Sequence, residues 1–267
     1  MLPSQWPNLA RQHDGACAVK SLLAREQREL LAQIAFARVL LGFDFDGTLA
    51  PIVERHEDAR MRDATALLFA RLCSLYPCAV ISGRGQSDIA SRLGGAQVKY
   101  VIGNHGLEPG ALTSEYEQEV AQVKPLLARV AVETPGVELE DKRYSLALHY
   151  RRARQKRSAR EAIARAVAAL PTPMRTVPGK LVFNLVPARA PNKGSALLAL
   201  REQEQADLAA YVGDDISDED VFQLDQPGRL VTVRVGASRS SQATYFVRDQ
   251  RAIDGLLSQL INLRLKH

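Results

Sequence analysis

The sequence predicts a doubly wound α/β fold, in which helices cover both faces of a parallel sheet, with a smaller α+β module inserted into it. Two observations predict this fold. Apolar runs of strand length alternate along the chain with segments whose apolar residues recur at helical spacing. In the middle of the chain, two β-rich pieces, each accompanied by a helix, interrupt this alternation. A chain of 267 residues is long enough for one such core and an insert.

The core is expected from apolar runs, several of them continuous, as in parallel strands that are covered on both faces. Residues 20–36 have the spacing of an amphipathic helix that precedes the first strand. The expected strands are 39–43, 78–82, 98–102, 208–212 and 229–235. The helices expected between and after them are 63–75, 86–93, 192–205, 217–224 and 250–264.

The insert is expected to begin and end at segments rich in glycine and proline, 106–113 and 187–192, which are typical of hinges. Its elements in order are a helix (115–131), strands (136–140, 144–150), a helix (157–170) and further strands (174–177, 180–186). We therefore expect three parts: an N-terminal helical extension (1–36), a catalytic core (37–107 and 187–267) and a cap domain (108–186).

The composition is that of an ordinary globular protein, with 46% hydrophobic and 24% charged residues. No apolar run approaches the ~20 residues of a membrane helix. The first residues lack the apolar stretch of a secretory signal, and Cys17, Cys73 and Cys78 are not spaced for zinc or for a disulfide framework. We expect a cytoplasmic location and no membrane partner.

The net charge of +5 is concentrated in residues 149–160. Such a segment is typical of a solvated surface, and it also favours the approach of anionic substrates. Neither a helix-turn-helix pattern nor interleaved aromatic residues accompany it, so no nucleic-acid partner is expected.

Polar clusters follow four of the expected strands, at the point where each strand ends. They are DFDGT (44–48), SGR (82–84), GNHG (103–106) and GDD (213–215), the last followed by Asp218, Glu219 and Asp220. Because ligands bind beyond the carboxyl ends of strands in an open α/β sheet, these clusters should meet at one edge.

Bringing Asp44, Asp46 and Asp214 together costs repulsion and desolvation unless a cation is present. Oxygen ligands alone indicate Mg²⁺. A calcium-binding EF-hand loop starting at Asp44 is excluded, because Leu49 and Arg55 stand where it needs glycine and glutamate.

A carboxylate beside Mg²⁺ can attack phosphorus and form an aspartyl-phosphate, and a second carboxylate two residues on can transfer the protons. Ser82 and Lys193 would then hold the phosphoryl oxygens. Each element alone has a plainer interpretation, such as a turn at DFD or a helix N-terminus at 218–220. Four clusters in order at strand ends favour the catalytic interpretation.

The motifs DFDGTL, ISGR, NKG and GDDISDED resemble the four motifs of the haloacid dehalogenase-like (HAD) phosphohydrolases, and the insert resembles their C2-type cap. DFDGTLAPI, GNHGLE, ELEDKRYSLALHYR, PGK and GDDISDEDVF are further similar to those of the trehalose-6-phosphate phosphatases, over residues 38–225. The resemblance implies a HAD-like Rossmannoid core with a C2-type cap.

The resemblance also implies roles. Asp44 would be the nucleophile and Asp46 the general acid/base, while Ser82 and Lys193 bind the phosphoryl group. The Asp44 carboxylate, the Asp46 backbone carbonyl and Asp214 would hold Mg²⁺, with support from Asp218. The positions implied in substrate binding are Gly47, Thr48, Arg84, His105, Glu108, Glu140, Lys142, Arg151, Lys180, Asn184 and Asp215.

One stretch of the cap departs from the family pattern. Asn184 stands where relatives commonly carry a glutamate, and Val186 where they carry an arginine. Because asparagine is uncharged and both donates and accepts hydrogen bonds, the change bears on the sugar that is recognised and leaves the catalytic aspartates untouched.

The function expected from this resemblance is a Mg²⁺-dependent hydrolase of trehalose biosynthesis, a phosphatase that converts trehalose 6-phosphate to trehalose and phosphate. The nearest alternatives act on another small-molecule sugar phosphate, such as sucrose phosphate or mannosylphosphoglycerate. A phosphomutase and a catalytically silent sugar-phosphate sensor are further alternatives. The presence of Asp44, Asp46, Lys193 and Asp214 together argues against the sensor.

Overall fold

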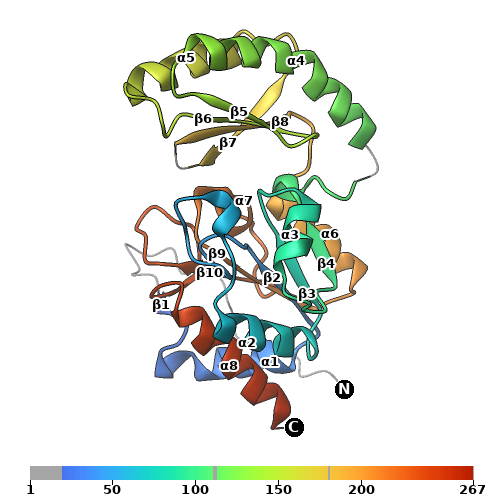
Figure 1. Ribbon diagram of the computed structural model, residues 1–267. Helices are drawn as coiled ribbons and strands as arrows, with labels where there is room; N and C mark the ends of the chain where they lie inside the picture. The colour runs from blue at the N-terminus through green and yellow to red at the C-terminus, as the bar shows by residue number, and fades with distance from the viewer. Residues whose placement is uncertain (1–19, 111–112, 180, 267) are drawn as a thin grey trace.

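Two β-sheets organise the chain, one seven-stranded and parallel, the other four-stranded and antiparallel. The computed structural model describes residues 20–110, 113–179 and 181–266. The larger sheet has helices on both faces, and the smaller sheet lies above it under its own two helices (Figure 1). The predicted α/β core with an inserted α+β cap is therefore confirmed.

The large sheet has the strand order β1-β11-β10-β9-β2-β3-β4. Its strands are β1 (Lys20–Ser21), β2 (Val39–Phe43), β3 (Cys78–Ile81), β4 (Tyr100–Ile102), β9 (Leu208–Gly213), β10 (Leu230–Val235) and β11 (Tyr245–Val247). Phe43, the last residue of β2, is in register with Val80 and Val212 on the neighbouring strands. The central strands therefore end at the same level, and the polar clusters that follow them share one edge.

The helices around this sheet form two layers. They are α1 (Arg28–Phe36), α2 (Asp63–Cys73), α3 (Gln86–Arg92), α6 (Lys193–Gln203), α7 (Glu219–Phe222) and α8 (Ala252–Leu265), with short 3₁₀ turns η1 (Arg25–Gln27), η2 (His56–Asp58), η3 (Asn104–Gly106) and η4 (Ile216–Asp218). Helices α1, α2, α3 and α8 contribute to one apolar cluster, and α6 and α7 contribute to the other. Burial on both faces explains why the strands are continuously apolar.

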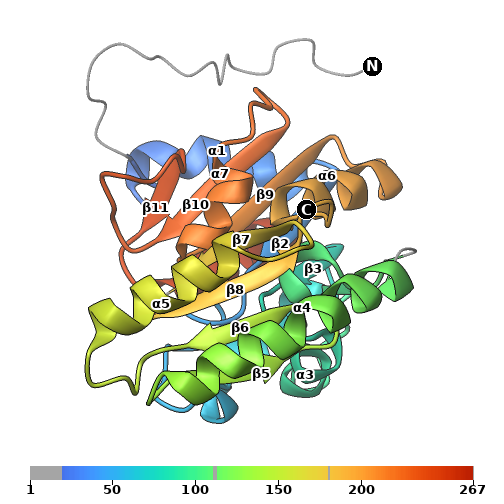
Figure 2. The ribbon, with the colours of Figure 1, turned by 90° about the horizontal axis from the view of Figure 1, so that it is seen from above.

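The small sheet has the order β5-β6-β8-β7, formed by β5 (Glu138–Asp141), β6 (Leu146–His149), β7 (Met174–Gly179) and β8 (Val182–Pro187). Helices α4 (Thr113–Glu133) and α5 (Lys156–Ala168) run side by side across it (Figure 2). Leu146, Leu148 and Leu185 pack beneath these helices. Since side chains alternate along a strand, the other face carries the row Glu140, Ala147 and Asn184 and is turned toward the large sheet (Figure 1).

The helix predicted over 20–36 is wrong at its start. Lys20 and Ser21 instead form β1, which pairs with Tyr245 and Phe246 of β11, and α1 begins at Arg28. This pairing joins opposite ends of the chain, so the local periodicity of 20–36 carries no sign of it. The helix predicted over 217–224 is likewise only η4 followed by the short α7.

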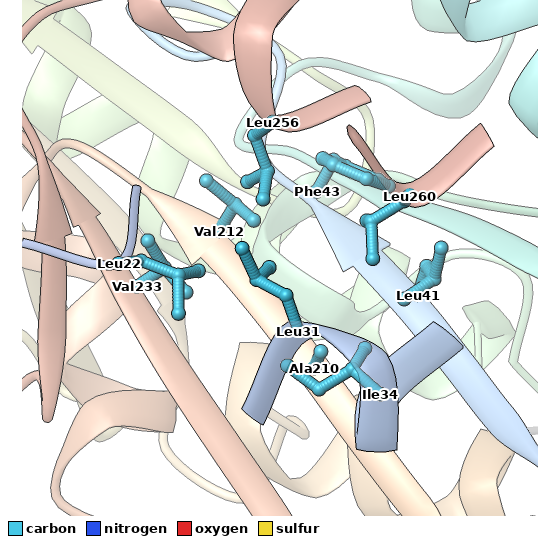
Figure 3. Close-up of a pocket in the computed structure, with 10 residues that line it drawn as sticks. All are labelled: Leu22, Leu31, Ile34, Leu41, Phe43, Ala210, Val212, Val233, Leu256 and Leu260. Atoms are coloured by element: carbon cyan, nitrogen blue, oxygen red, sulfur yellow. The ribbon is translucent and has the colours of Figure 1, made fainter. Parts of the chain in front are cut away.

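A small apolar cavity lies between the large sheet and the helices α1 and α8 (Figure 3). It is lined by Leu22, Leu31, Ile34, Leu41, Phe43, Ala210, Val212, Val233, Leu256 and Leu260. Because its lining has no polar side chain, it is a packing space of the core, not a place for chemistry. Within the described residues, no helix has the length and apolarity needed to cross a membrane.

Candidate active site

The polar clusters meet at the carboxyl edge of the large sheet, as their positions at strand ends predict. Asp44 continues β2, and its backbone N–H donates to Val212 O on β9 at 2.9 Å. Carboxylate oxygens of Asp44, Asp214 and Asp218 lie within 4.8 Å of one another. Two strands that are far apart in sequence therefore place three acidic side chains in one small volume.

The turn after β2 is shaped around the carboxylate of Asp214. Gly47 has φ +85°, and a Cβ at this position would collide with that carboxylate, so only glycine fits. The buried Thr48 donates its hydroxyl to Asp214 Oδ1 at 3.4 Å. Gly47 and Thr48 thus position Asp214 within the cluster.

Lys193 supplies the buried positive charge. It is the first residue of α6, which Asn192 caps by accepting a hydrogen bond from Ser195 N. Its ammonium lies 3.0 Å from Asp44 Oδ1 and 2.8 Å from Asp218 Oδ1. Burial disfavours the charge, but these two carboxylates outweigh burial and raise the pKa of Lys193.

The cluster has an excess of negative charge. Burial raises the pKa of Asp44 well above its usual range, and the neighbouring carboxylates add to this effect while Lys193 opposes it. Burial and the carboxylates of Asp218 and Asp215 likewise raise the pKa of Asp214 to about 7. One ammonium among three carboxylates leaves a deficit of positive charge, and all available ligands are oxygen atoms. The residues therefore fit a hard divalent cation such as Mg²⁺.

Asp218 is fully buried and already engaged by three donors. Its Oδ1 accepts from Lys193 Nζ and from the Tyr211 hydroxyl, both at 2.8 Å, and its Oδ2 accepts from Asp215 N at 2.9 Å. Among the described residues, Oδ1 therefore has two donors and Oδ2 has one, so the carboxylate holds Lys193 in place while Oδ2 keeps a free acceptor position.

Arg84 grips Asp46. Its Nε and Nη2 donate to Asp46 Oδ2 and Oδ1 at 2.6 and 2.7 Å, its Nη1 donates to Asp88 at 2.9 Å, and its Nη2 also donates to the His56 carbonyl at 2.7 Å. The Arg84 side chain is 1% exposed, whereas the Asp46 side chain is 34% exposed. The contacts of Arg84 are thus with protein groups, and they set the orientation of Asp46.

The second and third clusters lie against each other. The carbonyl of the buried Ser82 accepts from His105 N at 2.8 Å, and its hydroxyl accepts from Arg84 N at 3.2 Å. His105 is buried, and within the described part of the chain its two ring nitrogens have no hydrogen-bond partner. Burial and three neighbouring cations lower the pKa of its imidazole well below the usual value. A neutral histidine with two free nitrogens can bind a ligand oxygen.

Two of the predicted binding residues make contacts that support the loops of the site. Glu108 Oε2 accepts from Gln86 N at 2.7 Å and so supports the first turn of α3. Asp215 engages Asp218 through its backbone N–H, and its carbonyl accepts from Arg234 at 3.4 Å. Both sets of contacts fix loops at the edge of the site.

The cap reaches the same edge through the turn between β5 and β6. Lys142 donates to Gly83 O at 3.1 Å and lies 3.8 Å from Glu140 Oε2. Asn104 accepts from the Ser145 hydroxyl at 2.8 Å and donates to Lys142 O at 3.3 Å. Through these contacts the tip of the β5–β6 hairpin rests on the loops that carry Ser82 and His105.

The remaining predicted cap residues differ in their surroundings. Glu140 is 2.8 Å from His149 Nε2, and although burial opposes it, this contact and Lys142 lower the pKa of Glu140 to about 2. Asn184 is buried and donates to Val177 O at 3.3 Å. Arg151 is exposed, with no hydrogen bond or ion pair to any other described residue. Lys180 lies outside the described residues.

Comparison with known proteins assigns the chain to a family. The family model for trehalose-phosphatase matches residues 42–251, which include the whole carboxylate cluster and the cap. The chain belongs to the trehalose-phosphatase family.

Its relatives agree in sequence and in fold. The trehalose-phosphate phosphatase of Mycobacterium avium (strain 104) is 36% identical over 208 residues, which are 72% of this chain and 53% of that protein. The chain thus spans about half the length of the curated relatives it matches. The trehalose-6-phosphate phosphatase C-terminal domain of C. albicans shares the fold, with a TM-score of 0.76, 23% identity and coverage of 93% of this chain and 99% of that one. An Aspergillus fumigatus trehalose-6-phosphate phosphatase follows with a TM-score of 0.63, 26% identity and coverage of 91% and 99%.

Some residues of this candidate site could not be found by sequence reasoning alone. Asn104 stood inside the predicted GNHG cluster but without a role, whereas Ser145, His149 and Tyr211 carried no signal beyond their places in predicted strands. Each of them is recognised only by its contact with a predicted residue. Asn104 and Ser145 accept or donate hydrogen bonds at the backbone of Lys142, His149 contacts Glu140, and Tyr211 contacts Asp218.

Proposed function

We propose that this chain is a Mg²⁺-dependent phosphatase that hydrolyses trehalose 6-phosphate to trehalose and phosphate. The observation that carries the proposal is the buried contact of Asp44 with Lys193 beside Asp214 and Asp218, in a chain of the trehalose-phosphatase family. In this proposal residues 37–107 and 187–267 are the catalytic core, and residues 108–186 are the cap.

Asp44 is the nucleophile. Its carboxylate oxygen forms a bond to phosphorus while the bond from phosphorus to the sugar oxygen breaks, which leaves an aspartyl-phosphate. Lys193, 3.0 Å from Asp44, and Ser82 hold the phosphoryl oxygens during the transfer. Mg²⁺, held by the Asp44 and Asp214 carboxylates and the Asp46 carbonyl, would neutralise the surplus negative charge and orient the phosphoryl group.

Asp46 moves the protons. It gives a proton to the departing sugar oxygen, then takes one from the water that attacks phosphorus, after which phosphate leaves and Asp44 is regenerated. Because Arg84 occupies both oxygens of Asp46, the side chain exchanges one of these hydrogen bonds for the leaving oxygen during the reaction. Its partial exposure, 34%, leaves room for that exchange.

The cap recognises the sugar. Glu140 and Asn184 lie on the sheet face turned toward the core, and Lys142 lies at the tip of the hairpin that touches the core beside Gly83. His105 lies where the cap hairpin meets the core, and neither of its ring nitrogens has a hydrogen-bond partner among the described residues. It is therefore suited to bind a substrate oxygen. A closed cap would exclude bulk water from the aspartyl-phosphate. The cytoplasmic location and the absence of a nucleic-acid partner stay predictions.

A second candidate function keeps the chemistry and changes the substrate to another phosphorylated sugar or glycoside. Asn184 favours it, because the position that carries glutamate in the family pattern is an amide turned onto Val177 O. A panel of sugar phosphates assayed for phosphate release, with and without EDTA, separates the two. We expect the highest kcat/KM with trehalose 6-phosphate, no turnover in EDTA and none in Asp44→Asn.

The outcomes are distinct. A preference for a monosaccharide phosphate would contradict the trehalose assignment. Turnover by Asp44→Asn at the wild-type rate would remove Asp44 as nucleophile. Binding of sugar phosphate without any release of phosphate would favour the silent sensor.

A further inference from the structure

Tyr211 does not touch the proposed catalytic residues Asp44 and Lys193 in these contacts but is joined to them through Asp218. It lies on β9, is fully buried, and donates its hydroxyl to Asp218 Oδ1 at 2.8 Å. The same oxygen accepts from Lys193, which in turn contacts Asp44. We propose that Tyr211 is a positioning residue that holds Asp218, and through it Lys193, in the geometry that serves Asp44. The inference rests on the proposed phosphatase function.

The space around Tyr211 is shaped for its ring. A Cβ on Gly42, in the neighbouring strand β2, would lie 2.8 Å from Tyr211 Cδ2 and 2.9 Å from Leu197 Cδ1. A Cβ on Gly213 would collide with the Asp218 carboxylate. Neither glycine has a positive φ, so the backbone does not demand glycine at either position. Two strand glycines, which weaken a sheet, are therefore explained by the room that the phenol and the carboxylate need.

The hydroxyl also decides how Lys193 is shared. Asp218 is buried, and a buried carboxylate with too few donors is costly. Without the phenol, Lys193 would be the only donor to Asp218 Oδ1 among the described residues. The ammonium of Lys193 would then be drawn toward Asp218 and away from Asp44. Tyr211 thus leaves Lys193 balanced between the two carboxylates, 2.8 and 3.0 Å away.

The test is Tyr211→Phe, which removes one oxygen atom and keeps the ring. We expect kcat for trehalose 6-phosphate to fall about tenfold, the usual order for losing a hydrogen bond to a charged group. The KM, to which the untouched sugar contacts of the cap contribute, should change by less than about twofold. A second readout needs no turnover: affinity for beryllofluoride with Mg²⁺, a mimic of the phosphoryl group on Asp44, measured by ¹⁹F NMR, should also fall about tenfold.

The matched control is Tyr76→Phe. The Tyr76 hydroxyl is likewise buried and shares its single proton between Leu260 O at 3.1 Å and Ala35 O at 3.3 Å, away from the carboxylate cluster. We expect this variant to lower the melting temperature and leave kcat and beryllofluoride affinity unchanged. Gly42→Ala, which crowds the Tyr211 ring, should lower kcat in the same direction as Tyr211→Phe.

The outcomes separate this inference from the proposed function. Suppose that Tyr211→Phe has a lower melting temperature, as Tyr76→Phe does, but the kcat and beryllofluoride affinity of the wild type. Tyr211 then contributes to packing alone, and the inference fails. If the wild-type protein releases no phosphate, the proposed function fails, and beryllofluoride binding still decides the role of Tyr211. A wild-type protein that neither turns over nor binds beryllofluoride contradicts both.

Discussion

The edge of the large sheet and the facing side of the cap sheet carry charged residues in opposite ways. At the core edge, Lys193, Asp218 and Arg84 have side chains no more than 1% exposed, and each contacts two or more polar groups of the protein. On the cap, Glu140 and His149 are 41% and 39% exposed. These core side chains are therefore fixed by protein contacts before a substrate arrives, whereas Glu140, which is proposed to bind the sugar, remains open to water.

The difference has a physical reason. A buried charge is tolerated only when it is paired and hydrogen-bonded, so a buried catalytic cluster has to be complete within the protein. An exposed side chain such as Glu140 does not need complete pairing within the protein, because water hydrates it until a substrate arrives. Four predictions test this contrast, beginning with the largest expected effect.

Replacing Lys193 of the core and Lys142 of the cap, one at a time, separates chemistry from recognition. Lys193→Met should lower kcat by roughly a hundredfold or more, because the transferring phosphoryl group and Asp44 lose their cation. Lys142→Met should mainly raise the KM, by about tenfold, because a contact with the substrate or with Gly83 is lost. Steady-state kinetics with trehalose 6-phosphate provides both numbers. Equal effects on kcat would erase the contrast between core and cap.

Removing one carboxylate from the cluster should lower the activity and raise the melting temperature of the metal-free protein. Asp214→Asn should show at least a hundredfold lower activity, yet without metal it should melt at a higher temperature than the metal-free wild type, because a repulsive buried charge is gone. Added Mg²⁺ should raise the melting temperature of the wild type more than that of the variant, by mass action. Thermal melts with EDTA and with Mg²⁺ provide the comparison. A variant less stable than the wild type in EDTA would show that the negative charge is already balanced.

Restoring the family glutamate tests the departure in the cap. Asn184→Glu loses the hydrogen bond to Val177 O and brings a carboxylate toward that carbonyl, so the unfolding free energy should fall by about 1–3 kcal/mol. Asn184→Gln keeps the amide donor and is the control, expected to lose less. Urea unfolding measures both. If Asn184→Glu leaves kcat/KM for trehalose 6-phosphate unchanged, position 184 does not read the sugar.

The smallest effect concerns Glu140. Its pKa is lowered from 4.5 to about 2 in the folded protein, so its ionised form contributes stability that is fully present above pH 4.5 and is lost as the pH falls toward 2. The difference in unfolding free energy between wild type and Glu140→Gln should therefore be larger at pH 6 than at pH 3. Glu138→Gln, on the same strand and paired, among the described residues, only with the exposed Arg152, should change the unfolding free energy less at either pH. A difference for Glu140→Gln that does not shrink in acid would show that the contact with His149 adds no stability.

The sequence was sufficient for the fold and for much of the candidate site. Continuous apolar strands, a change of pattern between 108 and 186 and acidic motifs at strand ends are local features, so they can be read from short windows of sequence. Strand β1 could not be found in this way, because Lys20 and Ser21 become a strand only by pairing with Tyr245 and Phe246. Arg84 could be named as a residue of the site, but its choice of Asp46 as partner depends on a loop 38 residues away in the sequence.

The sequence by itself determined which side chains stand at the ends of the central strands, because the strand pattern and the motif that follows it lie within a few residues of each other. Only the tertiary structure decided how those side chains divide their contacts. Lys193 sits between Asp44 and Asp218, Tyr211 completes Asp218, and Asn184 turns to Val177 O. The reason is burial: once water is excluded, each polar group must find a partner among whatever the fold brings near, and that set comes from distant parts of the chain.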